Sequence, residues 1–237
     1  MKKKYYVPEN MVLILTGNFS NNDKEAVLNE FANQKNKSAI SRQPVNPEKG
    51  NPKKKTKIER SGITQAYICC GFRTVPANDP DVPALDLIDS VLGTGESARL
   101  FVELREKRAL TYDLAAINLS GLDYGFFAID CAVRPNSLKQ TQSIIQGELE
   151  KLKTELVPES ELEKSKNLLV ANHYRTIDDS HELPILLADS EIHYRNAKAI
   201  QDYLNRINQL SSQDIMETAK KYFREESYSW VILTGKK

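Results

Sequence analysis

Apolar residues alternate with other residues in several short stretches, the pattern of a strand with one buried face. In the first stretch Ala66, Ile68, Cys70 and Phe72 fall on the same face. The second and third are joined by a short turn containing Gly and Asp, which predicts a β-hairpin. The predicted strands cover residues 64–75, 111–119, 124–133 and 228–234.

Apolar positions three or four residues apart predict helices over most of the remaining chain. Ser211 and Asp214 have the spacing of a helix cap. Strands paired in hairpins and helices in runs predict an α+β fold, a mostly antiparallel β-sheet flanked by helices. The predicted helices cover residues 23–31, 81–92, 97–108, 137–155, 159–176, 180–195, 198–206 and 212–223.

The two ends of the chain resemble each other. Leu-Ile-Leu-Thr-Gly at 13–17 matches Val-Ile-Leu-Thr-Gly at 231–235. We interpret the match as a trace of duplication, with residues 11–16 as the final strand of an earlier domain. A chance match is the alternative, since apolar runs that end in Gly are common. The chain is then expected to be the latter part of something longer.

The composition of the chain suggests three segments. Residues 1–35 are expected to be the last strand and helix of a preceding related domain. Residues 36–57 are rich in Pro, Gly and Lys and are predicted to be a linker. We interpret its lysines as a solvated charge run rather than a site for an acidic partner. Residues 58–237 are predicted to form the C-terminal α+β domain.

The overall composition is that of an ordinary folded protein, with a formal net charge of +1 and 40% apolar residues. Such a balance gives no support for a nucleic-acid or membrane-surface binder. No apolar run reaches the roughly 18 residues that a membrane span needs. The apolar run 11–15 is too short for a secretory signal. We therefore expect a soluble protein, cytoplasmic by default, or periplasmic if a leader precedes this sequence.

Several candidate sites are excluded by their context. Residues 93–98 fit G-x-G-x-x-A, but a helix precedes them where a dinucleotide site needs a strand, so we predict a helix-ending turn. His173, His181 and His193 occur in neither H-E-x-x-H nor H-x-x-E-H. We interpret them as surface or capping residues. The three cysteines are too few for a disulfide framework or a thiolate zinc site. No metal site is predicted.

One segment carries a more specific signal. Residues 92–112 read Leu-Gly-Thr-Gly-Glu-Ser-Ala-Arg-Leu-Phe-Val-Glu-Leu-Arg-Glu-Lys-Arg-Ala-Leu-Thr-Tyr. This run resembles the pitrilysin / mitochondrial processing peptidase family of zinc metallopeptidases (inverzincins), in the C-terminal half that does not bind zinc. The resemblance also covers residues 5–17, the strand containing Gln65 and residues 161–166, so it extends over essentially the whole chain. It implies a domain of the LuxS/processing-peptidase-like metallopeptidase fold.

By that resemblance, Arg105 and Tyr112 are the pair that reaches across to the zinc-bearing half and helps to hold the scissile peptide. A guanidinium offers fixed, permanently charged donors and a phenol offers one directed O–H, which suits a developing oxyanion. The local pattern is compatible with this, since Arg105 lies one turn after Phe101 and Tyr112 opens the next strand. The alternative is that neither residue contacts a peptide, with Arg105 a solvated helix residue and Tyr112 a half-buried strand residue.

The zinc motif of the family, H-x-x-E-H, has no counterpart in this chain. The chain should therefore hold no cofactor and be inactive alone, with zinc expected in a missing half or a partner subunit. The function implied is the substrate-binding half of a zinc-dependent endopeptidase that acts on unfolded peptides. The alternative is an inactive scaffold or peptide-binding subunit of the same fold. The turn 93–95 is too short to imply recognition of mitochondrial presequences.

Overall fold

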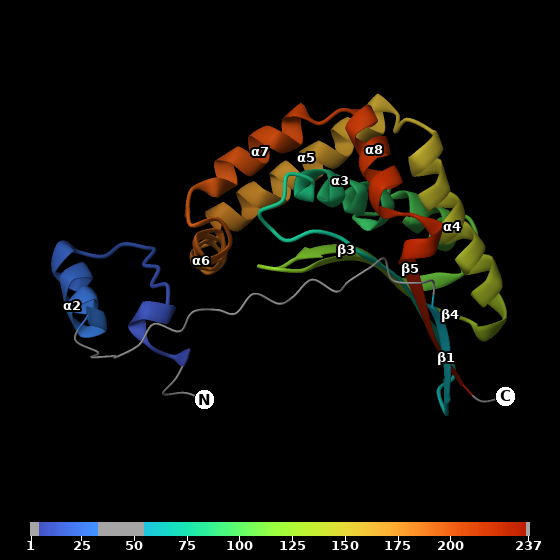
Figure 1. Cartoon of the computed structure of the whole chain (residues 1–237), viewed down its shortest axis with the longest axis horizontal. Coiled ribbons are helices and arrows are strands. Elements are labelled where there is room, and N and C mark those ends of the chain that lie inside the picture. Colours follow the sequence, from blue (N-terminus) through green and yellow to red (C-terminus); the bar gives the residue numbers. More distant parts are fainter. Residues whose placement is uncertain (1–4, 33–54, 236–237) are drawn as a thin grey trace. The chain divides into compact units, whose positions relative to one another are not determined.

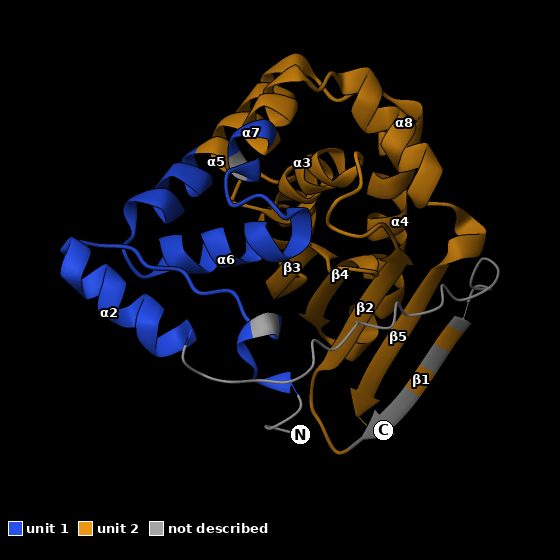
Figure 2. Ribbon diagram, turned by 60° about the vertical axis from the view of Figure 1, so that its left-hand side comes forward, with its two compact units in different colours: residues 1–47, 171–202 blue, residues 48–170, 203–237 orange. Residues whose placement is uncertain are grey.

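The computed structural model describes residues 5–32 and 55–235, and Figure 1 shows its helices and strands. The chain divides into two compact units, coloured separately in Figure 2. Unit 1 consists of residues 1–47 and 171–202, and unit 2 of residues 48–170 and 203–237. All five strands belong to unit 2.

The sheet of unit 2 has the strand order β1-β5-β2-β4-β3. Neighbouring strands are antiparallel except β1, which runs parallel to β5. The predicted α+β fold with a mostly antiparallel sheet is therefore confirmed. The strands are β1 (Lys55–Ser61), β2 (Ala66–Arg73), β3 (Thr111–Ser120), β4 (Gly125–Val133) and β5 (Tyr228–Gly235).

The helices lie close to their predicted ranges. In unit 2, α3, α4 and α8 lie over one face of the sheet (Figure 1). The predicted cap of α8 is present as a full capping box between Ser211 and Asp214. The α-helices are α2 (Asn21–Ala32), α3 (Val82–Gly93), α4 (Leu138–Thr154), α5 (Glu159–Asp178), α6 (Glu182–Tyr194), α7 (Ala199–Gln209) and α8 (Ser212–Tyr222). Short 3-10 helices occupy Pro8–Asn10, Pro135–Ser137 and Glu225–Ser227.

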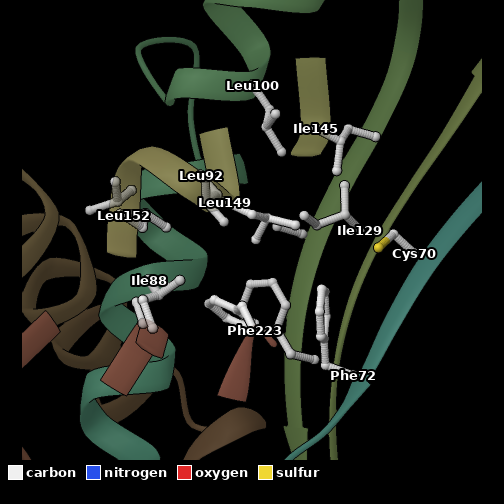
Figure 3. Packing of buried hydrophobic residues seen from close by; sticks show 14 of the residues in the cluster. Cys70, Phe72, Ile88, Leu92, Leu100, Ile129, Ile145, Leu149, Leu152 and Phe223 are labelled. Atoms are coloured by element: carbon white, nitrogen blue, oxygen red, sulfur yellow. The ribbon is translucent and has the colours of Figure 1, made fainter. Parts of the chain in front are cut away.

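The hydrophobic core lies between this sheet face and the helices that cover it. Ala66, Ile68, Cys70 and Phe72 are each at most 3% exposed, which confirms their predicted common face. Burial of a large aliphatic or aromatic side chain stabilises a fold by about 1.5–3 kcal/mol. Figure 3 shows Cys70 and Phe72 of β2 in the same cluster as side chains of the helices and the C-terminal segment, among them Ile88, Leu92, Ile145, Leu149, Leu152 and Phe223.

Two parts of the N-terminal prediction differ from the structure. Residues 11–16 form no strand, because a strand needs a neighbour to share its hydrogen bonds and the described residues offer none there. Residues 55–57, assigned to the linker 36–57, are instead the start of β1. Because β1 is rich in charged residues, as edge strands often are, it lacks the apolar alternation by which a strand is predicted from sequence. The rest of the predicted linker, up to residue 54, lies outside the described residues.

The helix predicted over 97–108 is shorter and differently wound. Its main part is a π-helix, η2 (Phe101–Glu106), preceded by a single helical step at residues 99–100. The N–H of Lys107 donates to the carbonyl of Val102, five residues back, at 2.9 Å. Apolar spacing indicates which face is buried, but it does not distinguish this wider turn from an α-helical one.

The end of α3 packs directly against β3. A Cβ added to Gly93 would lie 2.5 Å from the Cβ and 2.7 Å from the N of Ala116. The following Gly95 has a φ of +89°, so the 93–95 segment is the predicted helix-ending turn. Glycine at position 93 therefore permits an approach between helix and strand that no side chain allows.

We predict that Gly93→Ala lowers the free energy of unfolding by roughly 1–3 kcal/mol, because the added methyl group meets β3 backbone. Gly147→Ala is the matched control, since nothing lies within 4 Å of its added Cβ. It is expected to stabilise α4 by roughly 0.5–1 kcal/mol. Thermal unfolding followed by circular dichroism measures both. Equal effects of the two substitutions would contradict the close packing of α3 on β3.

Candidate functional site

The structure brings Arg105 and Tyr112 together at one end of the sheet. Arg105 lies on η2, and Tyr112 lies at the start of β3. The guanidinium carbon of Arg105 is 4.6 Å from the ring centroid of Phe101 and 5.9 Å from that of Tyr112. A guanidinium stacks favourably on aromatic rings. The two rings therefore fix where the positive charge of Arg105 is held.

The backbone around this pair departs from regular geometry three times. Arg105 is carried by the π-helix, and Ala109 follows with a left-handed φ of 49°. The register of β3 on β4 shifts between Thr111 and Asp113, so Tyr112 is the extra residue of a β-bulge. Its side chain is 81% exposed. Costly local geometries of this kind cluster at functional sites, which marks the segment independently of any resemblance.

The side chain of Thr111 holds the bulge in place. Its Oγ1 lies 2.7 Å from the carbonyl oxygens of both Asp113 and Ala132, and it accepts a hydrogen bond from the N–H of Asp113 at 3.1 Å. Thr111 is buried. The hydroxyl thus satisfies backbone groups that the bulge takes out of the ladder, and Tyr112 is left to point outward. This role of Thr111 could not be predicted from the sequence, because a threonine at a strand end is common.

Glu103, the acidic side chain on η2 two residues before Arg105, pairs with the cations that follow the helix. The carboxylate of Glu103 accepts a hydrogen bond from Lys107 at 2.6 Å and pairs with Arg108. These hydrogen bonds lower the pKa of Glu103. Within the described ranges no acidic side chain forms an ion pair with Arg105. Its N–H groups are therefore available to an acceptor from outside, such as a peptide carbonyl.

The residues that the structure describes do not fit a zinc ion. Among the residues that the structure describes, no three His, Cys, Asp or Glu side chains converge as metal ligands. His181 lies just before α6, and its main-chain N–H donates to Asp179 at 2.7 Å. His173 lies on α5, where burial lowers its pKa. His193 lies near the end of α6, beside the ring of Tyr194.

Two cavities in the described part of unit 2 differ in position and lining, and the second borders η2 at Val102 and Glu103. One, of about 360 Å³, has aromatic walls that include Phe72 and Tyr228. The other, of about 370 Å³, is lined by charged residues that include Arg99 and Glu148. Neither of these two cavities is lined by Arg105 or Tyr112. No helix in the described residues has the length and apolar character to cross a membrane.

Comparison with known proteins gives consistent matches over most of the chain. The family model described as the peptidase M16 inactive domain matches residues 1–169. The uncharacterized zinc protease YmxG of Bacillus subtilis (strain 168) is 24% identical over 225 residues, which cover 94% of this chain and 53% of that protein. The chain thus spans about half the length of the relative.

Solved structures agree on the fold. A protease from Helicobacter pylori matches with a TM-score of 0.83 and 23% identity, over 92% of this chain and 53% of that one. A peptidase M16 inactive domain from Pseudomonas fluorescens matches with a TM-score of 0.79 and 19% identity, over 92% of this chain and 52% of that one.

Proposed function

Because this chain belongs to the peptidase M16 inactive-domain family, we propose that it is the substrate-binding, non-zinc half of a zinc-dependent endopeptidase. The family expected from residues 92–112 is thereby confirmed, whereas the role of Arg105 and Tyr112 is our proposal. The observation that carries it is that Arg105, which forms no ion pair with an acidic side chain of the described residues, lies against the exposed ring of Tyr112. Both side chains are then directed to the scissile peptide.

The pair needs only to donate hydrogen bonds to the carbonyl oxygen of the peptide bond that is cleaved. When a peptide bond is attacked, negative charge develops on the carbonyl oxygen, and donors already in position stabilise it. Arg105 supplies a planar guanidinium, whose N–H groups suit an oxygen acceptor. Tyr112 adds one O–H donor. In our proposal the zinc chemistry belongs to the other half, since the residues of this chain do not fit the metal.

The other half is proposed to carry H-x-x-E-H, either on a longer form of this chain or on a separate subunit. The relatives, about twice the length of this chain, support a two-half arrangement. We also propose that residues 1–35 belong to a preceding related domain. Apolar side chains of this stretch, including Met11, Leu13 and Leu15, are exposed in this chain, which supports a covering partner.

The test is to purify the native protein from its source and identify every polypeptide present by mass spectrometry. Cleavage of an unfolded peptide is then assayed with and without a chelator. A chain about twice as long, or a partner, that carries H-x-x-E-H and cleaves in a chelator-sensitive way supports the proposal. A lone chain of 26.8 kDa, or a complex that cleaves no peptide, would instead favour the scaffold or peptide-binding alternative.

A further inference from the structure

The motif at residues 161–166 has no part in the function proposed above, yet its side chains reach the segment that carries Arg105. The carboxylate of Glu161 accepts two hydrogen bonds from Arg99, at 2.9 Å from Nε and 2.7 Å from Nη2. Both side chains are mostly buried, with 15% of Arg99 and 17% of Glu161 exposed. A two-point pair of this kind fixes orientation as well as distance.

A second polar link runs between the same two parts of unit 2. Lys164, one turn further along α5, donates from Nζ to the carbonyl of Ser97 at 3.1 Å. Between the two links, Leu162 is fully buried. The start of α5 therefore holds residues 97–99 at two points. We call this pair of links the α5 clamp.

The charge of Arg99 is secure in this position. Burial by itself would lower the pKa of Arg99, but the hydrogen bonds and charge of Glu161, with the charges of Glu148 and Glu155, outweigh it and raise the pKa. Removing one partner of a mostly buried pair leaves the other without compensation, which costs more than the pair contributes. Substitution of either Arg99 or Glu161 is therefore expected to disturb the structure around the α5 clamp.

The clamped residues lead directly into the helix that presents Arg105. Residues 99–100 are helical and continue into η2 without a break. Leu100 and Leu104 are fully buried on the inner face of this helix. The clamp thus fixes the start of the helix, the two leucines fix its rotation, and Arg105 emerges toward Tyr112.

We propose that Glu161, acting through Arg99, is a positioning residue for Arg105, with Lys164 in a supporting part. The inference rests on the proposed function, since it assigns Glu161 to the same peptide-holding site. The inference assigns a role to the motif at residues 161–166, because Glu161 forms its two hydrogen bonds with Arg99, 62 residues earlier in the sequence.

The first measurement compares Glu161→Gln with wild type in the assembled enzyme, that is, this chain with its zinc-bearing half. We expect kcat/KM for a quenched-fluorescence unfolded peptide to fall on the order of 10-fold, because small misplacement of a catalytic group is costly. Glu163→Gln is the matched control. It lies on the same helix, its side chain is 52% exposed, and it pairs with Lys166. The control is expected to keep wild-type kcat/KM.

The deciding measurement repeats Glu161→Gln in an Arg105→Ala background. If Glu161 acts through Arg105, the second substitution adds no further loss. A loss that persists at full size in this background indicates a general structural role and overturns the inference. If Glu161→Gln lowers the yield of folded protein, Lys164→Gln removes the weaker link instead, and its smaller loss must also vanish in the Arg105→Ala background.

The outcomes separate the two proposals. If Arg105→Ala impairs cleavage and neither Glu161→Gln nor Lys164→Gln does, the positioning role fails and the proposed function stands. If Arg105→Ala leaves cleavage unchanged, Arg105 has no part in holding the peptide and the positioning role of Glu161 fails, whereas the proposed function fails only if Tyr112→Phe also leaves cleavage unchanged.

Discussion

Arg105→Ala is expected to lower kcat/KM of the assembled enzyme by roughly 10–10³-fold, the range for loss of one transition-state donor. The fold should survive, because Arg105 forms no ion pair with the described acidic residues and rests on aromatic rings. Hydrolysis of a quenched-fluorescence unfolded peptide measures the loss, and circular dichroism checks the fold. Lys107→Ala is the matched control, since Lys107 directly follows η2 and its ammonium pairs with Glu103.

Tyr112→Phe is expected to lower kcat/KM in the same range, although it removes fewer atoms than Arg105→Ala. It removes one O–H and leaves the ring that lies beside Arg105. Tyr124→Phe is its control, an exposed tyrosine at the turn end of the same hairpin. Near-wild-type turnover in both Arg105→Ala and Tyr112→Phe would contradict the role assigned to the pair.

The regular elements of unit 2 could be predicted because each buries a single face. Ala66, Ile68, Cys70 and Phe72 alternate in the sequence for the same reason that they are buried in the structure. Helices that cover one sheet face show a corresponding apolar stripe. Local pattern and tertiary packing agree at these positions, so the pattern alone identifies the elements.

The predictions from sequence were wrong or incomplete where a strand pairs with a distant part of the chain or where the backbone is irregular. β1 is defined by its pairing with β5 at the far end of the chain, and its own sequence is mostly charged. The π-turn of η2 and the bulge at Tyr112 follow from packing and from the hydroxyl of Thr111, which no periodicity encodes. The sequence pointed to Arg105 and Tyr112 through a resemblance. It did not show their proximity, nor the α5 clamp that links segments 62 residues apart.

A second expected result concerns two partly buried carboxyl groups on α3, Asp86 and Asp89. Asp86 accepts short hydrogen bonds from Asn118 Nδ2 at 2.7 Å and Tyr203 Oη at 2.8 Å. Asp89 has only long ones, from Thr94 at 3.3 Å and the N–H of Asn118 at 3.5 Å. Burial, together with the neighbouring charge of Asp86, raises the pKa of Asp89 to about 7.

The direction of the effect on stability follows from this raised pKa. An aspartate in the unfolded chain titrates near 3.9, whereas Asp89 in the folded chain holds its proton up to about pH 7. Between these values the folded state binds more protons, so the free energy of unfolding falls as the pH rises. A difference of about 3 pH units corresponds to a loss on the order of 4 kcal/mol, complete above about pH 7.

Asp89→Asn is expected to remove this loss, because the amide carries no charge and can still accept one hydrogen bond and donate another. The melting temperature at pH 8 should rise by several degrees, at roughly 2–4 °C per kcal/mol for a chain of this size, and change little at pH 4. Glu96→Gln, at an exposed carboxylate in the turn that follows α3, is the control and should leave the pH dependence unaltered.

Asp86→Asn separates the effect of charge from that of hydrogen bonding at the same site. Both oxygens of Asp86 accept a hydrogen bond, and an amide has a single acceptor, so the hydrogen bond from either Asn118 or Tyr203 to this position is lost. The gain from neutralising Asp86 is therefore offset by the loss of a hydrogen bond to a charged group, about 1.5–3 kcal/mol. We expect only Asp89→Asn to raise the melting temperature at pH 8. An unchanged fall in stability between pH 4 and pH 8 in Asp89→Asn would show that another group causes the fall.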